Sequence, residues 1–140
     1  MRIAINGFGR IGRTVLRQIL SGHDDIEVAL INDIAPLETL AYLFRYDSVY
    51  GPFPGDVRID EGALQVAGRR IPVSHTPVFG DLACAGVDVL MACTGKVKTA
   101  LDAREGLATG ARRVLVSGPC CGAEVTCVMG ANEAVLAGDT

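Results

Sequence analysis

The sequence lacks a hydrophobic run of membrane-spanning length, and it lacks a surplus of positive charge. A transmembrane helix needs about 20 consecutive apolar residues, and the net charge of −3 leaves no electrostatic footprint for nucleic acid. Internal repeats and low-complexity segments are also lacking, and no secretory signal precedes the first apolar segment. These absences favour one folded domain over residues 1–140 that binds neither membranes nor nucleic acid.

The cysteines also lack a recognisable functional pattern. There are five, an odd number, and without a secretory signal we expect them to be reduced in a cytoplasmic protein. Zinc is one interpretation of Cys120, Cys121 and Cys127, but adjacent cysteines lack the usual ligand spacing and no histidine follows them. We therefore predict buried or incidental thiols, no metal site and no catalytic residue.

What the sequence does contain is a glycine-rich turn between an apolar strand and an amphipathic helix. The glycines follow residues 3–5 with the spacing G-x-G-x-x-G. Gly7 permits a sharp turn, Gly9 lets the backbone approach a pyrophosphate, and Gly12 lets the helix pack on the strand. By itself the motif is equally compatible with an ordinary loop. Its position between a strand and a helix is typical of a dinucleotide-binding turn.

An acidic residue stands where such a turn requires one. Residues 26–31 form an apolar run that ends at Asn32 and Asp33, and Asp33 follows Gly12 at about 20 residues, the distance expected for a carboxylate that binds ribose hydroxyls. The alternative is a helix N-cap or turn residue, because Pro36 follows. The charge of Asp33 would repel a ribose 2′-phosphate, and residues 34–37 contain no cation, so NAD is favoured over NADP.

The rest of the chain predicts an α/β fold of the Rossmann-like, doubly wound type, with a mostly parallel sheet. Small and hydroxyl-bearing residues end two of its strands, at Thr94-Gly95 and at Ser117-Gly118, where ligands of parallel sheets lie; ordinary loop starts are the alternative. Pro72 predicts an edge or bulged strand. The expected elements are a helix over 37–46, short antiparallel strands within 56–75, a strand over 87–93, a helix over 97–108 and a strand over 114–116.

Several motifs in the same order are similar to those of one enzyme family. They are I-N-G-F-G-R-I-G-R at 5–13, N-D at 32–33, Y-D-S-V-Y-G at 46–51, C-T-G at 93–95, G-A-R-R-V-L-V-S-G-P at 110–119 and V-M-G-A-N at 128–132. Together they resemble glyceraldehyde-3-phosphate dehydrogenase, a glycolytic oxidoreductase, and the closely similar erythrose-4-phosphate dehydrogenases. The resemblance covers all 140 residues, and it implies the family's NAD-binding domain with the final strand of that domain missing.

The resemblance also implies which residues bind the cofactor, NAD. The pyrophosphate would be surrounded by Asn6, Gly7, Gly9, Arg10 and Ile11. Asp33 would bind the adenosine ribose, Thr94 and Gly95 would lie along the cofactor, and Ser117 would lie near the nicotinamide.

The family's chemistry requires a residue that residues 1–140 do not contain. In the full-length parent a cysteine in an S-N-A-S-C-T-T-N stretch forms a thioester, and an aldehyde phosphate is oxidised with NAD and phosphate. We therefore expect the chain alone to be inactive. A stand-alone NAD-binding or regulatory module and a partly unfolded remnant that self-associates are alternatives; full-length family members are expected to be homo-oligomers.

Smaller departures concern the adenine pocket. The family's glutamate–arginine pair is replaced by residues 74–76, and His75 either takes over part of that contact or simply ends the strand, which we favour. Val97 replaces an aromatic residue. Lys96 and Lys98 are predicted to be solvated residues at the start of a helix.

Overall fold

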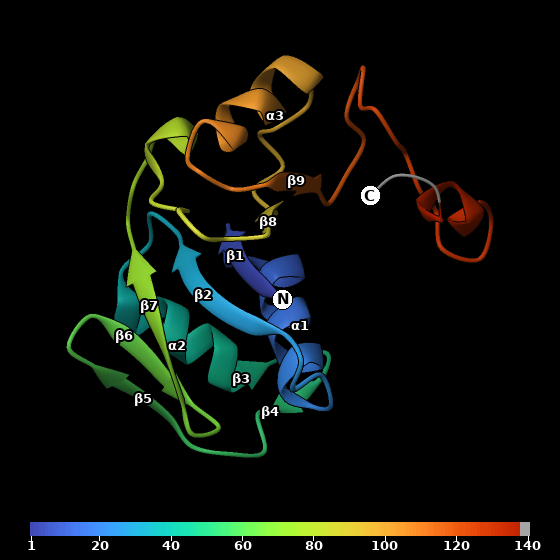
Figure 1. The fold of residues 1–140 in the computed structure, drawn as a ribbon. Helices are drawn as coiled ribbons and strands as arrows, with labels where there is room; N and C mark the ends of the chain where they lie inside the picture. The colour runs from blue at the N-terminus through green and yellow to red at the C-terminus, as the bar shows by residue number, and fades with distance from the viewer. Residues whose placement is uncertain (138–140) are drawn as a thin grey trace.

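The computed structural model describes residues 1–137 and consists of a seven-stranded sheet with helices on both faces (Figure 1). Within that part of the chain no helix is long and apolar enough to cross a membrane. The elements are β1 (Arg2–Asn6), α1 (Arg10–Leu20), β2 (Glu27–Asn32), α2 (Leu37–Arg45), β3 (Tyr46–Asp47), β4 (Gly51–Pro52), β5 (Val57–Asp60), β6 (Ala63–Val66), β7 (Arg69–Ser74), the 3₁₀ turn η1 (Phe79–Asp81), β8 (Val89–Ala92), α3 (Ala100–Leu107), β9 (Arg113–Val116) and the 3₁₀ turn η2 (Glu133–Leu136).

The strand order confirms the predicted fold class. The sheet runs β5-β6-β7-β2-β1-β8-β9, and all pairs from β7 to β9 are parallel. Taken in chain order, the parallel strands are arranged third, second, first, fourth and fifth, which is the doubly wound arrangement of dinucleotide-binding folds. Among residues 1–137 no sixth parallel strand follows β9. The order reverses between β1 and β8, and ligands of such sheets bind beyond the carboxyl ends of the strands at that point.

The short antiparallel strands form as expected, but the prediction from Pro72 is wrong. β7 lies inside the sheet between β6 and β2, and its pairing with β6 is regular. Pro72 pairs with Ala63 of β6, whereas the contact with β2 begins one residue later, at Val73. Proline lacks an N–H to donate, and Pro72 lies in the part of β7 that is paired with β6 and not yet with β2.

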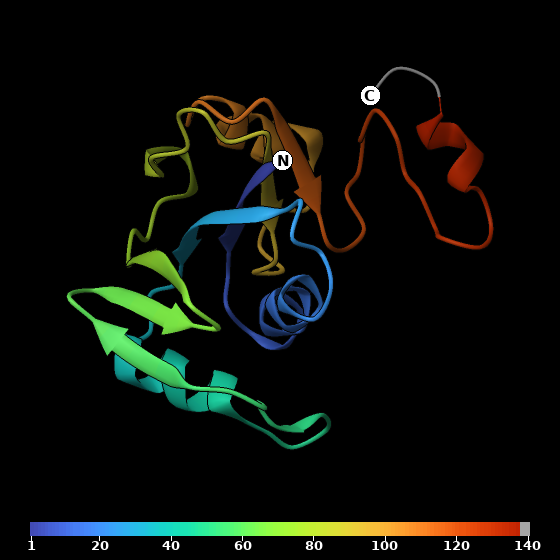
Figure 2. The same cartoon turned by 60° about the horizontal axis from the view of Figure 1, so that its bottom comes forward.

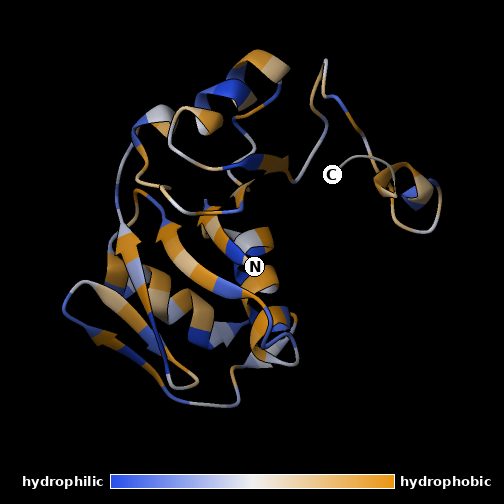
Figure 3. Ribbon diagram, in the orientation of Figure 1, coloured by the Kyte–Doolittle hydropathy of each residue, from blue (hydrophilic) through white to orange (hydrophobic). Residues whose placement is uncertain are grey.

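Two apolar clusters hold the helices on opposite faces of the sheet. On one face Leu16 of α1 and Phe44 of α2 are completely buried against Ile5 and its neighbours. On the other face η1 and α3 cover a smaller cluster around Leu90. Figure 2 shows α1 and α2 apart from α3, and Figure 3 shows the central strands as largely hydrophobic. Both faces of the central strands are therefore buried, as their continuous apolar sequences require.

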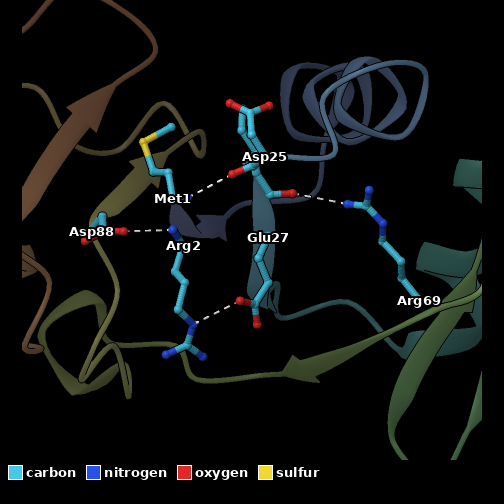
Figure 4. Close-up of polar contacts among 7 residues, drawn as sticks. Met1, Arg2, Asp25, Glu27, Arg69 and Asp88 are labelled. Atoms are coloured by element: carbon cyan, nitrogen blue, oxygen red, sulfur yellow. Dashed lines mark hydrogen bonds and ion pairs between the residues drawn. The ribbon is translucent and has the colours of Figure 1, made fainter.

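The amino ends of β1, β2 and β8 are fixed by polar contacts (Figure 4). The Met1 amine donates to the Asp25 carbonyl at 2.8 Å, and the Arg2 N–H donates to the Asp88 carboxylate at 2.8 Å. The Arg2 guanidinium also lies 3.4 Å from the Glu27 carboxylate. The hydrogen bond from the Arg2 N–H holds the pKa of Asp88 below its usual value. This end of the sheet is closed by its own side chains, and the opposite end carries the cavities.

Candidate functional site

The turn between β1 and α1 requires glycine at two positions for reasons internal to the protein. Gly7 has a φ of +97°, and a Cβ there would lie 2.8 Å from the Thr94 side chain. A Cβ at Gly12 would lie 2.2 Å from the Gly7 carbonyl oxygen, well inside van der Waals contact. Both predicted roles are confirmed: Gly7 makes the turn, and Gly12 allows the helix to lie directly against it.

Gly9 differs from these two because nothing in the protein requires a glycine there. Its φ of −78° is ordinary, and a Cβ would meet no atom within 4 Å. It is also the N-cap of α1, and no side chain caps this helix. The first N–H groups of α1 therefore lack a side-chain cap, and the positive end of the helix dipole lies at this point. This geometry fits a bound anion such as a pyrophosphate, which would approach the bare backbone closely.

The Asp33 carboxylate ties the glycine turn to the end of β2. Its Oδ2 accepts a hydrogen bond from the Phe8 N–H at 2.8 Å, and its Oδ1 accepts one from the Ala35 N–H at 2.9 Å. The N-cap of α2 is Pro36, so Asp33 is a turn residue and does not cap the helix. Because each carboxylate oxygen has two lone pairs, one acceptor site on each oxygen is left for a ligand.

A buried amide network, which the sequence analysis did not predict, joins the carboxyl ends of β1, β2 and β7. The Asn32 amide nitrogen donates to Asn6 Oδ1 and to the Thr76 carbonyl, both at 2.9 Å. Asn32 Oδ1 accepts from the Ser74 hydroxyl at 2.7 Å and from the Thr76 N–H at 2.8 Å. Asn32 is 3% exposed, so these partners replace water completely. The network fixes the floor of the site.

Two cavities lie beyond these strand ends, and together they contain every residue that the sequence assigned to the cofactor. The first, of about 420 Å³, is lined by Asn6, Gly7, Gly9, Asn32, Asp33, Ile34, Thr76, Pro77, Phe79, Cys93, Thr94, Lys96, Val97, Asp102 and Glu105. The second, of about 680 Å³, is lined by Arg10, Ile11, Ala92, Cys93, Thr94, Gly95, Val97, Lys98, Val116, Ser117, Gly118, Pro119 and Cys121. They share Cys93, Thr94 and Val97, so they form one trough.

Some residues of the trough were assigned no role in the sequence. Phe79, Asp102 and Glu105 come from η1 and α3, and only the packing of these elements over the strand ends brings them to the cavity. Asn32, in contrast, directly precedes the predicted ribose acid, and its position at a strand end could have indicated it. His75 is exposed, lies just after β7, and contacts the Asp33 carbonyl at 2.7 Å through Nδ1. It lines neither cavity, in agreement with the simpler interpretation.

The two cavities differ in charge. The carboxylates of Asp33, Asp102 and Glu105 line the first together with Lys96, whereas Arg10 and Lys98 line the second without any acid. The Lys98 and Thr99 N–H groups and the Thr99 hydroxyl hold the pKa of Asp102 below its usual value. Among the lining side chains, basic groups therefore predominate in the second cavity and acidic groups in the first.

The thiol at the centre of the trough is not arranged for nucleophilic chemistry. Burial raises the pKa of Cys93, and only a hydrogen bond with Ser117 opposes this effect. A raised pKa leaves the thiol protonated near neutral pH, whereas a nucleophile needs the thiolate. Burial likewise raises the pKa of Cys84. Within residues 1–137 the cysteines are free, and no three ligating side chains gather as a metal site.

Comparisons with known proteins agree with this geometry. Residues 1–100 match the family model described as "Glyceraldehyde 3-phosphate dehydrogenase, NAD binding domain". The chain is 49% identical over 140 residues to a glyceraldehyde-3-phosphate dehydrogenase of Cereibacter sphaeroides. The match covers 99% of this chain and 42% of that protein. A glyceraldehyde-3-phosphate dehydrogenase of Xanthobacter flavus is 48% identical, and the match covers 97% of this chain and 42% of that protein. One of Thermotoga maritima is 43% identical, and the match covers 94% of this chain and 40% of that protein. The chain thus spans about 42% of the first of these relatives.

Proposed function

The chain belongs to the glyceraldehyde 3-phosphate dehydrogenase family through its NAD-binding domain, and on this premise we propose that the trough holds NAD in an extended pose. The pyrophosphate lies over Gly7 and Gly9 at the start of α1. The adenosine occupies the first cavity, and the nicotinamide end lies in the second, toward Ser117. The observation that carries this assignment is that the trough lies beyond β1 and β8, where the strand order reverses.

Each residue has a distinct part in this proposal. Asp33 accepts hydrogen bonds from the ribose hydroxyls through its remaining lone pairs while it still holds the Phe8 N–H. The amide of Asn6 and the backbone N–H groups of Arg10 and Ile11 bind the pyrophosphate. Thr94 and Gly95 form the wall along which the cofactor lies. When bound, NAD supplies the hydride acceptor; the residues of this chain bind and orient it.

For the whole protein we propose the family's reaction, the oxidation of an aldehyde phosphate with NAD and phosphate. Family membership favours such a dehydrogenase domain over a stand-alone regulatory module. We also propose that the protein works in the reducing cytoplasm, where its free cysteines persist. Leu115 of β9 is 52% exposed, so we propose that this face is covered by self-association or by a homo-oligomer of the full-length protein.

Calorimetric titration of the chain with NAD and with NADP tests the function directly. We expect NAD to bind more tightly than NADP, because the Asp33 carboxylate repels a 2′-phosphate. The substitution Asp33→Asn removes the charge and keeps one acceptor oxygen, so it should narrow the preference by about tenfold or more. Asp33→Ala should narrow it too, with an added loss of stability because the Phe8 N–H loses its acceptor. Equal affinities for both cofactors in the unchanged chain would refute the role of Asp33.

A further inference from the structure

The only lysines of the sequence, Lys96 and Lys98, both lie in the trough. Every other basic side chain, the two histidines apart, is an arginine. Between the lysines lies Val97, which is 7% exposed and lines both cavities. Lys96 lines only the first cavity and Lys98 only the second. The two lysines therefore stand on either side of the place where the cavities join.

The backbone of this segment is anchored while both ammonium groups are unengaged. The Lys96 N–H donates to Thr94 Oγ1 at 3.2 Å, the Lys98 N–H donates to Asp102 Oδ2 at 3.1 Å, and the Lys98 carbonyl accepts from the Cys121 N–H at 2.8 Å. Within residues 1–137 neither ammonium forms an ion pair or a hydrogen bond. Two exposed ammonium groups without a partner among the described residues thus line the trough.

The start of α1 adds positive charge to the trough. Gly7 and Gly9 line the first cavity together with Lys96, and Arg10 lines the second together with Lys98. The uncapped start of α1 adds its own partial positive charge at this point. Asp102, which also lines the first cavity, already accepts backbone N–H groups, so its charge is partly engaged. An anion at the junction would meet Lys96, Lys98, Arg10 and the start of α1, although Asp33, Asp102 and Glu105 also line the first cavity.

We propose that Lys96 and Lys98, together with the start of α1, form a clamp on the pyrophosphate of the cofactor. This inference rests on the proposed function and assigns a role to two residues that the sequence alone indicated only as solvated. The lysine clamp, as we call this pair, neutralises a dianion that the backbone N–H groups of α1 alone would only partly neutralise.

Amine labelling of the unaltered chain tests the clamp, since Lys96, Lys98 and the Met1 amine are its only primary amines. Trace reductive methylation, followed by peptide mass spectrometry, would be measured with and without ligand. We expect NAD and ADP-ribose to slow modification of both lysines by about fivefold or more. Adenosine, which lacks a pyrophosphate, should not protect them. The Met1 amine, at the other end of the sheet, is the internal control.

Substitutions give a second measurement. We expect Lys96→Gln and Lys98→Gln each to weaken NAD binding by about fivefold to tenfold, with Lys98→Arg close to the unchanged chain. The double variant should also show a smaller fall in affinity with added salt. Arg104→Gln, on α3 but outside both cavities, is the matched control. NAD binding with unprotected lysines and unchanged affinities would overturn the clamp alone; failure of the unaltered chain to bind NAD would overturn the proposed function and the clamp together.

Discussion

At the scale of single residues, Gly9 and Gly12 offer a matched pair that separates stability from binding. Gly12→Ala places a methyl group 2.2 Å from the Gly7 carbonyl oxygen, and we expect it to destabilise the fold by about 2 kcal/mol or more. Gly9→Ala meets no atom within 4 Å; we expect stability to change by no more than about 1 kcal/mol and NAD affinity to fall by about tenfold. Urea unfolding and calorimetry measure the two quantities.

The opposite pattern would contradict the assignment of the site. If Gly9→Ala left NAD affinity unchanged, the cofactor would not approach the backbone at this turn. If Gly12→Ala proved neutral, the close approach of α1 to the turn would not be needed for folding.

Asn32 belongs to the residue scale as well, because one side chain satisfies four polar groups at the ends of three strands. Asn32→Ala leaves the Ser74 hydroxyl, both backbone groups of Thr76 and Asn6 Oδ1 without this partner. We expect a loss of about 3 kcal/mol or more in unfolding free energy, since unsatisfied buried polar groups cost about 1–3 kcal/mol each. Ser74→Ala removes one of these bonds and is the graded control. Chemical denaturation of both variants is the measurement, and equal losses would argue against a shared network.

At the scale of elements, α3 begins with a capping box. The Thr99 hydroxyl accepts from the Asp102 N–H at 3.1 Å, and Asp102 Oδ2 accepts from the Thr99 N–H at 3.0 Å. Thr99→Ala should therefore cost about 1 kcal/mol, measured as a lower unfolding midpoint, and Thr99→Ser should restore most of it. Because the same carboxylate anchors the Lys98 N–H, the alanine variant should also bind NAD more weakly. Stability equal to that of the unchanged chain would show that the cap contributes little.

The helices and strands also show how much of the fold could be predicted from the sequence. The spacing of apolar residues predicted α1, α2 and the buried strands. Apolar residues repeated every 3.6 positions are typical of a helix, and short continuous apolar runs are typical of a buried strand. The helix predicted over 97–108 begins only at Ala100, since the capping box outweighs the apolar Val97. The prediction from Pro72 failed because a proline can lie inside a sheet where its strand is paired along one edge only. β7 is paired with β6 as far as Pro72 and with β2 from Val73 onward.

The same limit applied to the site. The glycines, Asp33 and the strand-end residues could be predicted because each carries a local motif. The remaining walls could not, because Phe79 and Glu105 reach the cavity only through the packing of η1 and α3. Lys96 and Lys98 are exposed, as the sequence predicted, but their position beside the two cavities depends on the assembled sheet and could not be predicted.

At the scale of the whole molecule, stability should fall in acid through carboxylates far from the trough. The pKa of Asp88 is lowered by the hydrogen bond from the Arg2 N–H and by Arg112. A lowered pKa in the folded state stabilises the protein above the unfolded value of about 3.9, and that contribution is lost as pH falls through the folded value. Asp88→Asn should therefore destabilise the chain at pH 7 and have less effect at pH 3.

Urea unfolding at both pH values measures this difference. Asp25→Asn is the control, because Asp25 contacts Met1 through its backbone carbonyl and its side chain forms no ion pair among residues 1–137. The same loss at pH 7 and pH 3 would show that the Arg2 contact does not favour the ionised carboxylate.

Asp33 has both a structural role and a proposed role in cofactor preference, which limits how that preference can be redesigned. A change toward NADP must remove its negative charge, yet the same carboxylate accepts the Phe8 and Ala35 N–H groups. Replacement by a small apolar residue would loosen the glycine turn along with the preference. A workable redesign would keep an uncharged acceptor at position 33, such as asparagine, and introduce a cation at position 34, which also lines the first cavity. Cofactor choice and turn integrity would then be separable traits.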